Sequence, residues 1–104
     1  MLDAIPIGAY LNRVGVTWSA AAAKHGVARE DALHAMVHAL YVEVSFDDPR
    51  PPATVRPTLY VGPQRDPRGP LLEVMVEAIP PRDVHVFHVM PARAKHLARM
   101  KERP

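Results

Sequence analysis

The sequence predicts an α+β fold made of two N-terminal helices, a four-stranded antiparallel meander sheet and a C-terminal helix. Three observations lead to this prediction: one stretch repeats its apolar residues with the helical period, four later stretches are patterned like strands, and only short turn-rich links join those strands. The chain has 104 residues, of which 48% are hydrophobic, enough for one modest core. We therefore expect a single domain over 18–104, preceded by a weakly patterned arm at 1–17.

The helices are predicted from caps and from periodicity. Ser19 can cap a first helix over 20–24, and Gly26 stands where a helix stop belongs. Apolar residues in 29–40 fall at i, i+3, i+4 and i+7, namely Leu33, Met36, Val37 and Leu40. Pro91 opens the last helix, because proline is tolerated in a first turn. We expect these helices to cover one face of the sheet.

The strands are predicted from alternating or continuous apolar residues bounded by turns. They cover 41–46, 58–61, 71–79 and 84–90. In the first strand, Val42 and Val44 should face the core. In the third, Glu73 and Glu77 should share a solvated face with Tyr60 of the second strand. The last strand is almost continuously apolar, which is typical of a strand covered on both sides or lying against a partner.

Composition and motifs exclude several function classes. The chain has no cysteine, which rules out disulfides, thiolate nucleophiles and cysteine-ligated metal sites. Gly-x-Ser-x-Gly, phosphate-cradling glycine-rich loops and zinc-finger spacings do not occur. His34 and His38 stand four residues apart without a His-Glu-x-x-His pattern, so we expect no metal and no cofactor. There is no signal-peptide pattern or membrane-length apolar run, which predicts a cytoplasmic protein that does not enter a membrane.

Charge is distributed unevenly, although its sum is only +2. Residues 30–48 hold five acids and no Lys or Arg, whereas 50–69 and 93–104 are both basic. If the proline-rich loop at 49–57, the following hairpin tip and the final helix meet at one end of the sheet, seven net positive charges gather there and attract a polyanion. The alternative is a solvated arginine-rich surface.

A candidate site lies where the last strand passes into the final helix. His88, Arg93 and the free N–H groups at the helix start come together there, an arrangement that suits a phosphate. Two alternatives stay open: His88 as a hydrogen-bonded core residue, and Arg93 as the structural ion-pair partner of Glu73 or Glu77. His85 and His88 have opposite parity, so only one can face a site unless a β-bulge intervenes.

Three motifs resemble those of the BrnT group of bacterial ribonuclease toxins, within the wider RelE-like class. They are Lys24-His25-Gly26-Val27 followed by Glu30-Asp31-Ala32, then Phe46-Asp47-Asp48-Pro49, and a closing strand that ends in His88-Val89-Met90-Pro91-Ala92-Arg93. The resemblance covers about residues 18–100. Members of that family inhibit translation by cutting RNA, and a small DNA-binding antitoxin neutralises them. His88 stands where the family has an arginine, and Pro91 where it has a serine.

The resemblance implies a toxin of a toxin–antitoxin pair that acts as a metal-independent endoribonuclease. Its expected partners are RNA, either free or ribosome-associated mRNA, and a cognate antitoxin protein, with a homodimer left open. His88 and Arg93 are the expected catalytic residues. The expected substrate-binding residues are Arg56, Tyr60, Lys95, Arg99 and Lys101. The alternative is a non-catalytic protein-interaction module or an inactive member of the same fold, whose binding should depend little on salt.

Overall fold

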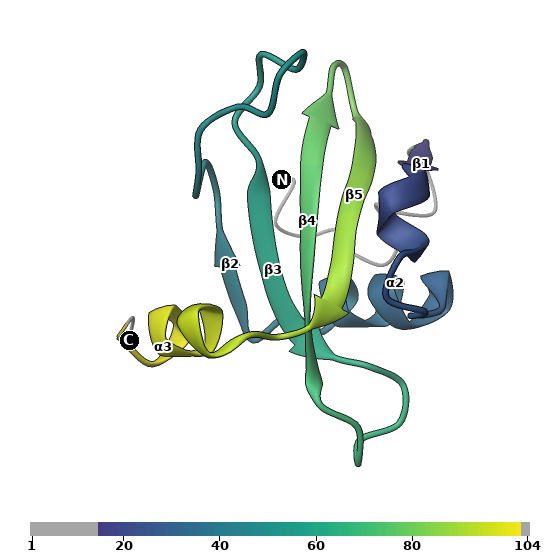
Figure 1. Cartoon of the computed structure of the whole chain (residues 1–104), viewed down its shortest axis with the longest axis vertical. Coiled ribbons are helices and arrows are strands. Elements are labelled where there is room, and N and C mark those ends of the chain that lie inside the picture. Colours follow the sequence, from purple (N-terminus) through teal and green to yellow (C-terminus); the bar gives the residue numbers. More distant parts are fainter. Residues whose placement is uncertain (1–14, 103–104) are drawn as a thin grey trace, which may run out of the picture.

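The structure is a computed structural model and describes residues 15–102 (Figure 1). The strands are β1 (Val16–Trp18), β2 (Tyr41–Glu43), β3 (Thr58–Pro63), β4 (Leu71–Ile79) and β5 (Asp83–Pro91). They form one mixed sheet in the order β1-β5-β4-β3-β2. The helices are a short 3-10 helix, η2 (Ala20–Ala23), and the α-helices α2 (Arg29–Val37) and α3 (Ala94–Glu102). None of the helices within 15–102 is long and apolar enough to span a membrane.

The predicted architecture of two N-terminal helices, a four-stranded antiparallel meander and a C-terminal helix is wrong. The sheet has a fifth strand, β1, which pairs parallel with β5 and places Thr17 beside His85. Three residues whose partner lies 68 positions away leave no periodic signal, so the sequence pattern did not reveal this strand. The first predicted helix is a single 3-10 turn that follows β1 directly. The predicted arm lies outside the described residues over 1–14, while residues 16 and 17 belong to β1.

Both faces of the sheet are covered, whereas helices were expected on one. The face that we call the α2 face packs against η2 and α2, and the buried Met36 of α2 belongs to this part of the core. The opposite α3 face holds Leu59 and Phe87 and packs against α3. The predicted solvated side of β4 is therefore wrong, because Glu73 and Glu77 on the α3 face are both buried.

The edge strand β2 has the opposite parity to the one predicted. Val42 and Val44 are 46% and 72% exposed, while Tyr41 packs against the core of the α3 face. Leu40, expected inside the helix stripe, follows the end of α2 and is 62% exposed. Within the described residues α2 packs mainly on β3 and β4, which leaves Val42 on the edge strand largely uncovered.

We expect Gly62→Ala to destabilise the fold strongly, because β3 touches α2 at this glycine. An added Cβ would collide with the carbonyl oxygen of Ala35 and lie 2.9 Å from its carbonyl carbon, and backbone atoms cannot move aside easily. Urea denaturation should show a loss of about 2–3 kcal/mol in the free energy of unfolding. Gly69→Ala is the matched control, because the atoms nearest to its methyl group belong to the flexible side chain of Gln64. Equal losses in the two variants would contradict this account of the contact.

Candidate functional site

A β-bulge in β5 sets the direction of the candidate site residues. Met75 pairs with His88 and Val76 pairs with Val86, so Phe87 is an extra residue with no partner on β4. Strict alternation would send Phe87 and His88 to opposite faces, but the bulge turns both toward the α3 face. A β-bulge therefore lies between His85 and His88, the exception under which both can face the same side of the sheet.

Ser19 fixes η2 beside the edge of β5. Its backbone N–H donates to the carbonyl oxygen of Val86 at 2.9 Å, and its hydroxyl donates to that of Phe87 at 3.4 Å. The same hydroxyl oxygen accepts a hydrogen bond from a backbone N–H of η2 and caps this short helix. Lys24 and His25 follow η2 directly and so lie next to the bulge.

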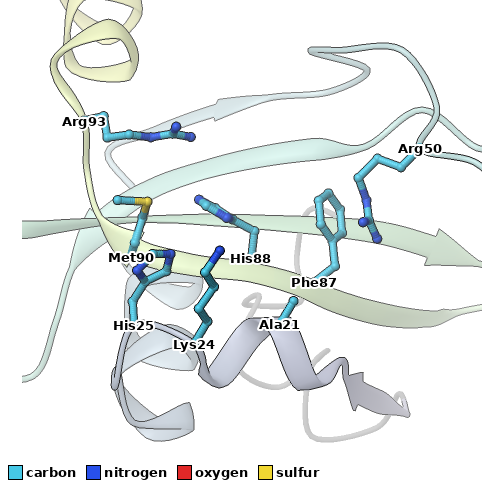
Figure 2. A pocket seen from close by; sticks show the side chains of 8 residues that line it. All are labelled: Ala21, Lys24, His25, Arg50, Phe87, His88, Met90 and Arg93. Carbon is cyan, nitrogen blue, oxygen red and sulfur yellow. The ribbon is translucent and has the colours of Figure 1, made fainter.

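These elements surround an open pocket of about 470 Å³ (Figure 2). It is lined by Ala21, Lys24, His25, Arg50, Phe87, His88, Met90 and Arg93. We call it the cationic pocket, because its lining includes three basic side chains and two imidazoles and, among the described residues, no carboxylate. The rings of His25 and His88 meet edge to face with their centroids 5.9 Å apart. Figure 2 shows Arg93 and Arg50 at opposite ends of the pocket, with His88 between them.

One fully buried carboxylate, Glu73, holds two residues of the pocket. His88 Nε2 donates to Glu73 Oε2 at 2.7 Å. Arg93 donates from its backbone N–H at 2.8 Å and from its guanidinium at 2.7–3.2 Å. Burial by itself raises the pKa of Glu73, but the hydrogen bonds from His88 and Arg93 outweigh it and lower the pKa to about 2. Because the ionised carboxylate only accepts, His88 Nε2 must carry a proton, which leaves Nδ1 as the acceptor of the neutral ring.

The ion pair does not remove either residue from the pocket. Arg93 pairs with Glu73 rather than Glu77, which decides between the two structural partners considered from the sequence. Its side chain is still 41% exposed, and that of His88 is 22% exposed. The hydrogen bonds to Glu73 raise the pKa of Arg93, so this group stays charged. Glu73 therefore holds both side chains on their buried side, and their exposed side remains accessible to a ligand in the pocket.

The structure does not bring Tyr60 or Arg56 to the pocket. Tyr60 pairs with Val74 and packs on the α2 face, so the sheet separates it from His88. Its predicted position on one face with Glu73 is wrong. Arg56 donates to the backbone oxygen of Asp47 at 3.1 Å within the proline-rich loop and does not line the pocket.

The predicted RNA track on α3 also lies outside the cationic pocket. Arg99 forms a bidentate ion pair with Glu43 at 2.7 and 3.0 Å, and this pairing raises the pKa of Arg99. Lys95 and Lys101 are exposed on α3. The three basic segments do not meet, because the proline-rich loop and the hairpin between β3 and β4 lie at opposite ends of the sheet (Figure 1).

Sequence reasoning missed Lys24, His25, Arg50 and Phe87 as pocket residues. The signal for Lys24 and His25 was present, since both belong to the first motif of the resemblance. Arg50 carried no signal, because its place depends on how the proline-rich loop folds back over β5.

The remaining histidines serve other contacts. His85 shares the α3 face, because it pairs with Glu77, but its Nδ1 lies 2.7 Å from the hydroxyl of Thr17 on β1. His34 Nδ1 lies 2.8 Å from the last carbonyl oxygen of β3, and its ring contacts the ring of His38 at a tilt of 40°, with the centroids 4.3 Å apart. Within residues 15–102 no three potential ligands gather as a metal site would require.

Comparisons with protein-family models, curated proteins and solved structures found no match for this chain. The chemistry of the cationic pocket therefore has to follow from its own geometry.

We expect Glu73 to dominate the acid sensitivity of the fold. Its pKa falls from 4.5 to about 2 on folding, so its contribution is complete above about pH 4.5 and disappears as the pH drops toward 2. This loss should be on the order of 3 kcal/mol. Glu73→Gln should lack this part of the pH dependence and be destabilised at pH 7 by about 3–5 kcal/mol, because Arg93 loses its buried counter-charge and the neutral amide accepts only part of the hydrogen bonds from Arg93 and His88. Urea titrations at several pH values measure both effects, and an unchanged acid slope in the variant would contradict the assignment.

His96 of α3 is a second buried titratable group, and unlike Glu73 it lies in surroundings that disfavour its charged form. It is 3% exposed, and neither ring nitrogen has a hydrogen-bond partner among the described residues. Its Nε2 lies 3.8 Å from Glu73 Oε2, and its ring meets Phe46 edge-on at 6.0 Å. Burial lowers the pKa of His96 below 6.5, against the raising effect of Glu73 and together with the nearby cations.

The His96→Leu variant should gain stability, most of all at mildly acid pH. The unfolded chain protonates His96 as the pH falls through about 6.5 while the folded chain resists, so the wild type loses stability below neutral pH. Leucine removes this proton uptake and the unpaired ring nitrogens. Thermal unfolding at pH 7.5 and 5.5 should therefore show a larger advantage for the variant at pH 5.5. An advantage that is equal at both pH values would argue against a neutral buried ring.

Proposed function

We propose that this chain is a metal-independent endoribonuclease, the toxin component of a bacterial toxin–antitoxin pair, and that the cationic pocket receives a phosphate of RNA. One observation carries the proposal: two imidazoles with ring centroids 5.9 Å apart share an open pocket with Lys24, Arg50 and Arg93. Imidazoles exchange protons near neutral pH, and basic side chains stabilise the charge that develops on a reacting phosphate. The set can therefore support transesterification by acid–base chemistry alone.

The geometry suggests a role for each group. His88 Nδ1 takes the proton of a ribose 2′-hydroxyl, and the 2′-oxygen forms a bond to phosphorus. The bond from phosphorus to the 5′-oxygen breaks, and His25 in its protonated form gives a proton to that leaving oxygen. The products are a 2′,3′-cyclic phosphate and a 5′-hydroxyl. Lys24 and Arg93 lie where they can hold the non-bridging oxygens during this step.

Glu73 is a positioning residue in this scheme. It binds the Nε2 proton of His88 at 2.7 Å and so holds the tautomer whose Nδ1 accepts. The same carboxylate fixes Arg93 through its backbone and its guanidinium. A carboxylate, an imidazole and a reacting hydroxyl in series is a general arrangement for orienting a base.

An apolar strip on the far edge of the sheet favours the alternative of a protein-interaction module. Val42 of β2 and Leu40 and Val44, which flank this strand, are exposed, whereas the pocket lies beside η2 and β5 at the other side of the sheet. Under the proposed nuclease function, by contrast, the partner expected for a protein-binding surface is the cognate antitoxin. A docking module without nuclease activity would bind its partner with little salt dependence and would not bind RNA.

We expect His88→Ala and His25→Ala each to reduce cleavage of single-stranded RNA by a factor of about 10²–10⁴, because each removes one proton-transfer group. The assay contains a chelator, and each variant is first shown to unfold at a temperature similar to the wild type. His85→Ala is the matched control, since that ring shares the strand and the face but bonds Thr17 instead. Growth arrest on induced expression should follow the same order. Wild-type activity in both pocket variants, or no cleavage by the wild type, would reject the proposal.

A further inference from the structure

We infer that Arg50 and Phe87 form a nucleobase-stacking subsite at one end of the cationic pocket, so that the pocket takes a nucleotide rather than a bare phosphate. This inference rests on the proposed function for the nature of the ligand, an RNA strand. It adds a recognition element that neither the phosphate chemistry nor the motifs require.

The geometry of the pair points to stacking. Arg50 Cζ lies 3.6 Å from the centroid of the Phe87 ring, a distance that leaves room only for plane against plane. Phe87 is 6% exposed and packs against the guanidinium, while the Arg50 side chain is 48% exposed. One face of the guanidinium is therefore covered by the ring, which lies between Arg50 and His88 in Figure 2, and the opposite face is turned away from His88 at the end of the pocket.

A second contact holds the guanidinium in this orientation. Arg50 Nε lies 3.3 Å from Oε2 of Glu77, whose side chain is only 9% exposed. The buried carboxylate offsets much of the positive charge of Arg50, so this residue offers a fixed flat surface more than a free cation. Guanidinium planes and aromatic rings are the surfaces on which proteins stack unpaired RNA bases. Because Phe87 and Glu77 already order the side chain, little further entropy is lost when a base stacks on it.

The position of the subsite fits a nucleotide. Arg50 lies at one end of the pocket, and His88 with Lys24 occupies the middle (Figure 2). A base stacked on the outer face of the guanidinium lies at the end of the pocket, and the rest of the strand runs past Phe87 toward the two imidazoles. The subsite would then fix the register of the strand, so that a chosen 2′-hydroxyl faces His88.

The test compares a 2′-O-methyl oligoadenylate, which cannot be cleaved, with an abasic oligomer that has the same number of phosphates. Fluorescence anisotropy with the full chain should give at least about fivefold tighter binding of the oligoadenylate, the size of effect that one stacked base produces. Arg50→Lys keeps the charge but removes the plane, and it should bring this affinity ratio close to one. Arg56→Lys, in the same loop but outside the pocket, should leave the ratio as in the wild type.

The outcomes separate this inference from the proposed nuclease function. Equal affinity for both oligomers in the wild type, no binding of either oligomer, or an unchanged ratio in Arg50→Lys would overturn the stacking subsite. A ratio that depends on Arg50 supports the subsite even when RNA cleavage is absent, in which case the nuclease proposal alone fails. Cleavage that depends on His88 without any base preference leaves the nuclease proposal standing and removes the subsite.

Discussion

A negative charge buried inside the sheet organises this molecule. Glu73 is fully buried on β4, and a carboxylate in such a place costs several kcal/mol unless it is paired and hydrogen-bonded. β5 supplies His88, and the chain entering α3 supplies both the backbone and the side chain of Arg93. Satisfying one carboxylate therefore determines where α3 starts and how two pocket side chains point. The site geometry is a consequence of the requirement that makes this core stable.

The pocket lies where the regular sheet ends. β1 pairs with β5 only as far as Val86, and the bulge follows at the next residue, Phe87. Beyond that point η2 takes the place of a strand, tied to β5 by Ser19. Bulges redirect side chains, and here two consecutive residues of one strand, Phe87 and His88, face the same cavity. A parallel strand, a bulge and a 3-10 turn together make an opening that an uninterrupted sheet would lack.

The basic side chains of the pocket are well fixed, but their net positive charge is small. Arg93 and Arg50 are both paired with buried carboxylates, and within the described residues Lys24 makes no ion pair. Other arginines are also paired, as Arg65 is with Asp31. The surface is thus less cationic than a count of basic residues indicates. What the pairing supplies is preorganisation, because donors and planes that are already fixed lose little freedom when a ligand arrives.

The sequence by itself determined the features that depend on near neighbours. Strands β3 to β5 follow from short-range alternation and apolar runs, α2 follows from the 3.6-residue period, and the strand-to-helix junction pointed to His88 and Arg93. Only the tertiary structure decided the parallel pairing of β1, the bulge at Phe87, the burial of Glu73 and the arrival of Arg50. The physical reason is that these features arise from contacts between segments far apart in the chain. Strand register, and whether a second face of the sheet is covered, depend on both of the surfaces that come together. The periodicity of one segment alone does not predict either of them.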